Sequence, residues 1–288
     1  MTPQTDKEMF RRLIIGVVTA PIAGGALALT ARLAAELELE IEGLFIEDES
    51  LMGLAALPRR SEVRLGSGRL EPLDRGRLEQ DLRRAAARLE ANLSRAASAA
   101  RALHRFRLER GDLGTVIGAS VTRDDLVAII AEGTLHPATE LHLAVIQARA
   151  SVLLIPSRLA RRPGSIVAVV TGGSVDERTV TLAGRLAARR RERLEVFALS
   201  ADRANSEQIT RIVEKLRLDR SRWSLGELPM AHTASVADAL GRALGAVSQR
   251  LVVLPRSLPG LVGARELAGL AATLRAPVLV LEPPEDNS

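Results

Sequence analysis

Short apolar runs alternate with longer amphipathic segments along almost the whole chain. The run at 12–19 is apolar, rich in β-branched residues and about as long as a buried strand. The next segment, 24–38, carries leucine and alanine at helical spacing, and 41–47 is apolar again. This alternation predicts a mostly parallel sheet with helices on both faces, an α/β fold.

The first half of the chain is predicted to hold five strands. The expected strands are 12–19, 41–47, 104–109, 126–131 and 151–155. The expected helices are 24–38, 49–57, 74–102, 115–123 and 138–149. Glycines at 66 and 68 and a proline at 72 predict a loop before the long helix.

The second half repeats this order with less material. Its strands are expected near 165–171, 193–200, 222–228, 250–254 and 277–281, and its helices near 175–190, 205–217, 235–248 and 264–274. Local sequences recur as well, including Arg-Leu-Ala-Ala at 32–35 and 185–188, a phenylalanine in each second strand (Phe45 and Phe197), and Arg-Ala-x-Val-Leu at 149–153 and 275–279. A repeat this long indicates a duplicated domain rather than a solenoid.

We therefore predict two doubly wound five-stranded units, at 11–157 and 165–283, joined by a short basic linker. The first unit carries an insertion, 49–73, without a counterpart in the second; it is interpreted as a lid, a partner-binding segment or a local packing element. Ligands of such units bind beyond the carboxyl ends of the strands, after strands one and four.

Composition narrows the classes of function. The 288 residues contain no cysteine, which excludes disulfides and thiolate chemistry, and the histidines lack zinc-site spacing. No apolar run is long enough to cross a membrane and no signal peptide is recognisable, so we expect a cytoplasmic protein without a membrane partner. Basic and acidic residues are mixed along 75–95 and aromatics are only 2%, so we expect no nucleic-acid partner.

A family resemblance rests on the order of several segments. Gly43-Leu-Phe-Ile-Glu-Asp48 follows the first helix, and Leu126-Val-Ala-Ile-Ile130 precedes a helix and the Arg-Ala-x-Val-Leu strand. With the repeated Val-Val strands, these segments resemble the universal stress protein family in its tandem two-domain form. The resemblance implies the adenine nucleotide alpha hydrolase-like fold, two units paired as an internal pseudo-dimer, and in many members ATP or AMP binding.

The chain departs from the nucleotide-binding pattern of that family. Binding members carry an aspartate straight after strand one, where we identify Thr19 and Thr171 here. A threonine supplies no carboxylate for the adenosine moiety. In the phosphate loop of the first half Gly133 is retained, but His136 and Pro137 replace a glycine and remove a backbone donor.

The second half keeps only the inner glycine spacing of the phosphate loop, at 260 and 263. We therefore expect eroded ATP sites and no cofactor. The alternative is ATP or AMP bound by the second half. In that case Thr171, Gly172, Gly173 and Ser174 would form an anion cradle, with Arg256 and Ser257 facing it across the crevice.

Each of these features also has a purely structural interpretation. Ser174 and Glu177 fit a capping box, and Arg256 can pair with Glu282. The acidic run 47–49 is predicted to begin a solvated loop.

The sequence thus predicts a non-catalytic regulatory or adaptor protein that acts on a protein partner or as a homodimer. An adenine-nucleotide-binding stress protein is the alternative, and an ATP-cleaving enzyme is the weakest hypothesis.

Overall fold

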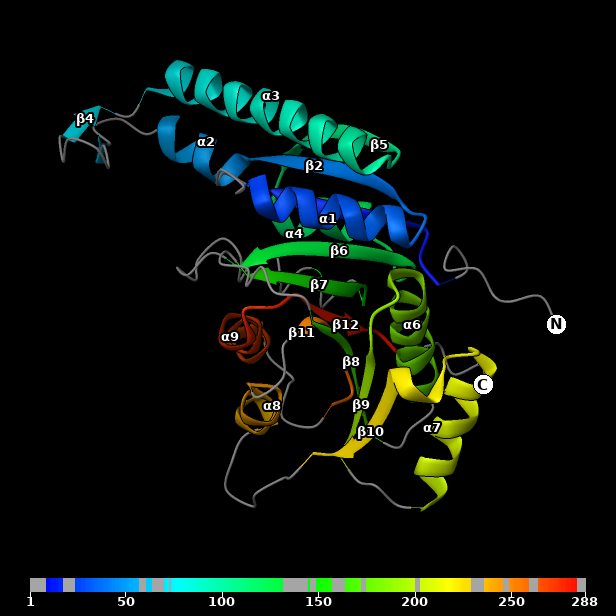
Figure 1. Cartoon of the computed structure of the whole chain (residues 1–288). Helices are drawn as coiled ribbons and strands as arrows, with labels where there is room; N and C mark the ends of the chain where they lie inside the picture. The colour runs from blue at the N-terminus through cyan, green and yellow to red at the C-terminus, as the bar shows by residue number, and fades with distance from the viewer. Residues whose placement is uncertain are drawn as a thin grey trace.

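A computed structural model describes residues 9–17, 24–56, 61–63, 70–72, 74–131, 145, 149–156, 164–171, 175–199, 203–228, 236–245, 249–258 and 264–283. Their main feature is one sheet of ten strands with helices on both faces (Figure 1). The strand order is β10-β9-β8-β11-β12-β7-β6-β1-β2-β5. The two halves of the chain therefore build the two halves of one continuous sheet.

The first half of the chain supplies β1, β2, β5, β6 and β7 to this sheet. Its strands are β1 (Arg12–Val17), β2 (Glu40–Asp48), β5 (His104–Gly111), β6 (Asp125–Ala131) and β7 (Ser151–Pro156). Its helices are α1 (Gly24–Glu36), α2 (Glu49–Ala56), α3 (Arg75–Ala100) and α4 (Leu113–Ser120). A small hairpin, β3 (Ser61–Val63) and β4 (Leu70–Pro72), stands apart from the main sheet. Most of the helix expected at 138–149 lies outside the described residues.

The second half supplies the remaining five strands. They are β8 (Ser165–Val170), β9 (Leu194–Ala198), β10 (Trp223–Glu227), β11 (Gln249–Pro255) and β12 (Val278–Leu281). The helices are α6 (Val175–Arg190), α7 (Arg203–Lys215), α8 (Val236–Gly245) and α9 (Ala264–Leu274), with a single turn of 3-10 helix at Arg220–Arg222.

Both halves have the same topology. Within each, the first strand lies between the second and the fourth, and all neighbours are parallel. The halves join where β12 pairs with β7 in antiparallel fashion, with Val278 opposite Leu154 and Val280 opposite Val152. The predicted fold class, two doubly wound five-stranded units, is confirmed, and the units share one sheet. The unit boundaries 11–157 and 165–283 stay a prediction.

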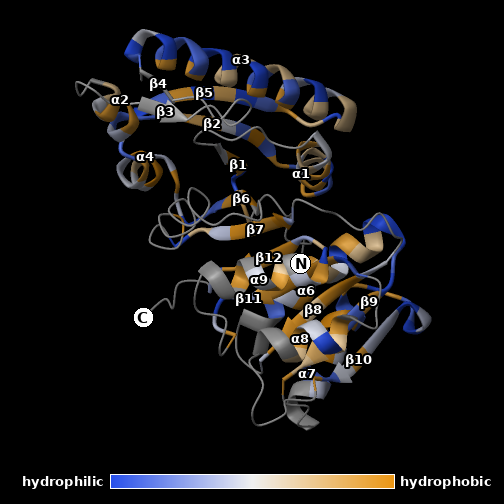
Figure 2. Cartoon of the chain, turned by 90° about the vertical axis from the view of Figure 1, so that its left-hand side faces the viewer, coloured by the Kyte–Doolittle hydropathy of each residue, from blue (hydrophilic) through white to orange (hydrophobic). Residues whose placement is uncertain are grey.

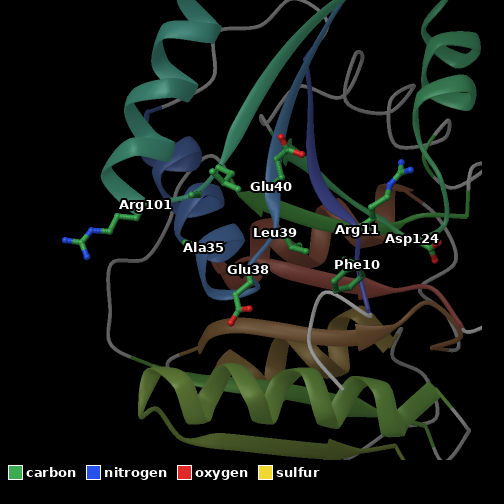
Figure 3. A pocket seen from close by; sticks show the side chains of 10 residues that line it. Phe10, Arg11, Ala35, Glu38, Leu39, Glu40, Arg101 and Asp124 are labelled. Carbon is green, nitrogen blue, oxygen red and sulfur yellow. The ribbon is translucent and has the colours of Figure 1, made fainter. Parts of the chain in front are cut away.

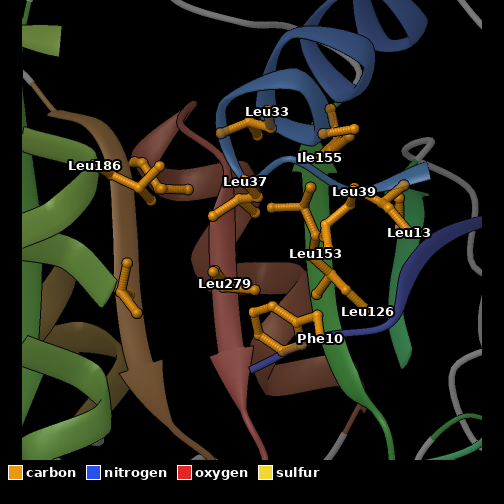
Figure 4. Close-up of a cluster of buried hydrophobic side chains, with 14 of the residues drawn as sticks. Phe10, Leu13, Leu33, Leu37, Leu39, Leu126, Leu153, Ile155, Leu186 and Leu279 are labelled. Carbon is orange, nitrogen blue, oxygen red and sulfur yellow. The ribbon is translucent and has the colours of Figure 1, made fainter. Parts of the chain in front are cut away.

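The two faces of the sheet carry separate apolar layers. One layer lies under α1, α3, α6 and α7 and continues across the seam between the halves, where Leu37 and Phe10 lie near Leu153 and Leu279 (Figure 4). The other layer lies under α4, α8 and α9. Because apolar side chains of both halves meet in each layer, the seam is part of the core.

Helix α3 shows how the sequence sets one of these layers. Asp74 caps its first turn by accepting a hydrogen bond from the backbone N–H of Gly76. Five apolar side chains at helical spacing are buried: Leu82, Ala86, Leu89, Leu93 and Ala97. The charged residues between them face outward, which gives α3 its mixed blue and orange ribbon in Figure 2. The mixed charges of 75–95 therefore lie on a solvent-exposed face of the helix.

Local chemistry shifts some elements from their expected places. Helix α4 begins at Leu113 rather than 115, because the Asp112 side chain accepts a hydrogen bond from the Thr115 N–H and caps the helix. The expected loop around 72 is partly wrong, since Pro72 ends β4 and pairs with Ser61. A proline fits there because the strand is short and belongs to a two-stranded hairpin.

The two phenylalanines predicted to be equivalent are one position apart in the repeat. Leu13 lies opposite Ile41 in the first half, as Ile166 lies opposite Leu194 in the second. Counting along β2 and β9 from these pairs matches Phe45 with Ala198 rather than with Phe197. The two rings consequently lie in different layers of the core, because a shift of one residue moves a side chain to the other face of a sheet.

Candidate functional site

The predicted site of the second half lies where β8 and β11 end. These strands are parallel neighbours, with Val253 opposite Ala168. Thr171 directly follows β8 and is half-buried, while Arg256 and Ser257 directly follow β11. The structure therefore brings Thr171 and Arg256 to the carboxyl ends of adjacent strands, the place predicted for a ligand.

Arg256 is already engaged at this edge. Its Nε donates to the carboxylate of Glu282, and its Nη2 donates to the carbonyl oxygen of Ala150 at 2.8 Å. The side chains of Arg256 and Glu282 are only 14% and 11% exposed. Arg256 thus ties the ends of β11 and β12 to the start of β7, as the structural interpretation predicts.

One nitrogen of Arg256 has no partner within the described part of the chain. Its Nη1 is buried and has no hydrogen-bond partner among the described residues. Ser257 beside it is exposed. The guanidinium therefore keeps one nitrogen, with two N–H donors, for a ligand, although its charge is shared with Glu282.

Several predicted site residues lie outside the described part of the chain. They are Thr19, Gly133, Gly172, Gly173 and Ser174. Thr171 directly follows Val170, and the strand pairing matches Val170 with Val17. Thr19 lies outside the described residues, so its equivalence to Thr171 stays a prediction.

The acidic side chains at the end of β2 have separate partners and do not converge on one point. Glu47 accepts hydrogen bonds from Arg110 of β5, the shorter 2.8 Å long. Asp48 accepts from the N–H of Ser50 and so caps α2, and Glu49 lies in the first turn of that helix. The expectation of a solvated loop start is wrong for Glu47, which is 5% exposed. Its partner Arg110 lies 63 residues away in the chain, beyond any local pattern.

A surface hollow of about 720 Å³ lies at the opposite edge of the first half, at the amino ends of its strands (Figure 3). Its lining residues are Phe10, Arg11, Ala35, Glu38, Leu39, Glu40, Arg101, Ala102, Leu103 and Asp124. Its volume falls in the range of small-molecule sites. Its rim mixes both charge signs, however, and Arg101 points away from it. The hollow is therefore a different place from the predicted crevice.

A buried ion network lies near this edge, on the α4 side of the sheet. The carboxylate of Glu42 is fully buried and meets three arginines: Arg12 at 2.5 Å, Arg105 and Arg107. Arg12 also donates to Asp125 on β6 at 3.0 Å. The network fastens the edge strand β5 to the middle of the sheet, and sequence reasoning missed it because its members are far apart in the chain.

The pKa of Asp125 reflects this network. Burial by itself would raise the pKa of the carboxyl, but hydrogen bonds from Arg12, Arg11 and the Thr122 N–H outweigh burial and lower it. Asp125 is therefore held ionised. In the second half the corresponding polar pair is smaller, with Ser165 donating to Glu195 at 2.6 Å.

Metal ligation finds no support in the described residues, where no three histidines or carboxylates gather around a common point. None of the described helices combines the length and apolarity needed to cross a bilayer.

Comparison with known proteins gives matches in structure only. No protein-family model matches the chain, and no curated protein sequence does. A universal stress protein from Archaeoglobus fulgidus superposes with a TM-score of 0.62 at 13% identity, covering 95% of this chain and 97% of that one. A putative universal stress protein from Pseudomonas aeruginosa gives 0.52 at 16% identity, over 95% and 94% of the two chains.

The structural match is not limited to universal stress proteins. The cytoplasmic domain of a prokaryotic cation chloride cotransporter gives a TM-score of 0.50 at 10% identity, over 94% of this chain and 95% of that one. Likeness at such low identity establishes architecture and not activity. Together with the strand order and the antiparallel seam, the near-complete coverage shows that this chain has the tandem fold of universal stress proteins.

Proposed function

We propose that the chain acts by binding and regulation rather than by catalysis, as a cytoplasmic stress-response protein of the universal stress type. The observation that carries this proposal is the pairing of Arg256 with Glu282. A phosphate placed at the carboxyl edge of β11 would have to displace a carboxylate that is already close-packed there. Regulation would then run through a protein partner or a second copy of the chain.

A second candidate is an adenine-nucleotide binder that uses the second half. It is favoured by the unpartnered Nη1 of Arg256 and by the position of Thr171 on the adjoining strand end. The two candidates differ in what Glu282 does. In the first it occupies the place of a phosphate, and in the second it only orients the arginine.

A thermal-shift titration with ATP and with AMP separates the candidates. A ligand present at 100 times its dissociation constant adds about 2.7 kcal/mol of stability, which gives a clear rise in melting temperature. We expect no rise for the natural chain at millimolar nucleotide. For Glu282→Gln we expect a rise, because this change leaves the charge of Arg256 unneutralised.

The matched control is Glu47→Gln, which breaks the ion pair with Arg110 at the end of β2. This variant should show no response to nucleotide. A rise for the natural chain that is lost in Arg256→Gln would establish the second candidate instead. Sustained release of phosphate from ATP would overturn the non-catalytic proposal.

A further inference from the structure

The excess positive charge of the chain is confined to its second half. Residues 11–157 contain 19 basic and 19 acidic side chains, whereas residues 165–283 contain 17 basic and 12 acidic ones. The even mixing of charge that argues against a polyanion partner therefore holds for the first half alone.

Much of this excess gathers where β9 and β10 begin. The end of α6 and its connection to β9 read Arg189-Arg190-Arg191-Glu192-Arg193, and the connection from α7 to β10 holds three more arginines, at 217, 220 and 222. The two connections lie side by side, because Leu194 and Trp223 pair at the start of the strands. Arg222 accordingly donates to the carbonyl oxygen of Glu192 at 3.4 Å.

We call this surface the arginine edge: Arg191, Arg193, Arg217, Arg220, Arg222 and Arg250. Arg250 joins it from β11 through a 2.8 Å ion pair with Glu192. Arg191, Arg193 and Arg220 are exposed, and no ion pair within the described ranges involves them. The edge therefore offers several guanidinium groups to a partner.

The arginines that precede β9 have no equivalent in the first half, although Arg220 stands where the first half has Arg101. Strand pairing matches Leu194 with Ile41, so Arg191 and Arg193 stand where the first half has Glu38 and Glu40. If both halves had kept the residues of a common ancestor, these positions would carry the same charge in both halves. The charge of this edge is thus a property of the second half and not of the fold.

The composition of the edge indicates which partner it suits. Guanidinium groups match phosphate and carboxylate oxygens. A protein interface needs an apolar centre, and the only aromatic residue beside this edge, Trp223, is half-buried against the core. Single-stranded nucleic acid needs exposed aromatic faces. A duplex backbone needs only spaced cations.

We propose that the arginine edge binds the phosphate backbone of double-stranded nucleic acid without reading its sequence. The proposal does not depend on how the crevice at Arg256 functions. Binding of this kind is weak, with dissociation constants on the order of 10⁻⁴–10⁻⁶ M at physiological salt, and it strengthens steeply as salt is lowered.

The test is fluorescence anisotropy of a labelled mixed-sequence DNA duplex of about 20 base pairs, titrated with the full chain between about 50 and 200 mM salt. The variant Arg191→Gln/Arg193→Gln/Arg220→Gln should weaken binding at least tenfold at low salt. It should also flatten the salt dependence, since each lost phosphate contact removes about 0.9 from the logarithmic slope. Thermal unfolding of the variant should be unchanged, because all three side chains are exposed.

The matched control is Arg83→Gln/Arg88→Gln/Arg101→Gln, which removes the same charge from exposed positions of the first half. This control should keep more than half of the affinity. Equal losses in both variants, or no binding at the lowest salt, would overturn the proposal. So would competition by polyglutamate as effective as that by unlabelled duplex, which would indicate an acidic protein partner instead.

Discussion

At the scale of single residues, Glu42 pairs with three arginines. Its carboxylate is fully buried and is neutralised by Arg12 and by two arginines of β5. Removing one member of a buried ion network leaves the remaining charges uncompensated, at a cost of about 3–5 kcal/mol. We expect Glu42→Gln to lower the free energy of unfolding by about 3 kcal/mol, measured by urea denaturation.

The control for Glu42 is an exposed pair on α3. Asp81 lies 3.4 Å from Arg84, and both side chains are more than half exposed. Such pairs contribute about 0–1 kcal/mol, so Asp81→Asn should change stability by less than about 0.5 kcal/mol. Similar losses in the two variants would show that burial of Glu42 is not what makes its pairs matter.

The lowered pKa of Asp125 predicts how stability depends on pH. In the unfolded chain this carboxyl titrates near pH 4 and therefore binds a proton before the folded state does as pH falls. Its contribution is fully present above the unfolded pKa and is lost as pH falls through the folded pKa. Denaturant unfolding at a series of pH values below about 4 should show a steep loss of stability. Asp125→Asn should be less stable at neutral pH and show a shallower loss.

These residues mark the limit of prediction from sequence at this scale. Glu42 lies in Glu40-Ile41-Glu42, an alternation typical of a half-exposed strand, and its partner Arg105 is 63 positions away. Burial of an acid depends on which strands become neighbours, and local pattern carries no such information. The pairing of Arg256 with Glu282 could be predicted, because Glu282 follows an adjacent strand of the same predicted sheet.

At the scale of elements, the end of α3 offers a direct test of backbone cost. Arg101 follows this helix with φ 58° and ψ 36°, in the left-handed region, and its side chain is exposed. Glycine adopts this conformation without the steric cost of a Cβ atom, so we expect Arg101→Gly to raise the free energy of unfolding by about 0.5–1 kcal/mol.

The same substitution within α3 should act in the opposite direction. Arg88 is exposed in the helix interior, where glycine costs up to about 1 kcal/mol relative to alanine. Arg88→Gly should therefore destabilise the chain in the same denaturation assay. A loss of stability in both variants would show that the Arg101 side chain makes a contribution larger than its backbone cost.

Elements with strong periodicity are those that the sequence predicts well. The buried β-branched strands and α3 lie within a few residues of their expected bounds, because apolar spacing alone specifies them. The hairpin of β3 and β4 was missed, since three-residue strands are too short to show a period. The offset of the phenylalanines was missed because repeated letters indicate likeness and not register.

At the scale of the whole molecule, the seam explains why the chain is one body and not two. It combines the β7–β12 pairing with a hydrogen bond between the halves, in which Arg178 of α6 donates to the carbonyl oxygen of Met9, shortly before β1. The pseudo-dimer was predicted only through the family resemblance. The ion pairs across the seam could not be predicted, because the sequence does not show that α1 and α6 are neighbours.

The charges of the seam lead to a final prediction. Arg190 of α6 donates to Glu36 of α1 at 2.6 Å, with side chains 9% and 26% exposed. Two first halves paired in this way would place glutamates together, and two second halves would place arginines together, so the charges favour pairing of unlike halves. Because this pair is mostly buried, a double-mutant cycle of Arg190→Ala and Glu36→Ala should give a coupling energy of about 1–2 kcal/mol. The same cycle on the exposed pair of Lys215 and Glu177, 4.0 Å apart, should give less than about 0.5 kcal/mol. Equal couplings would show that the halves are held together by their apolar layers and strands alone, with no contribution from charge to the choice of partner.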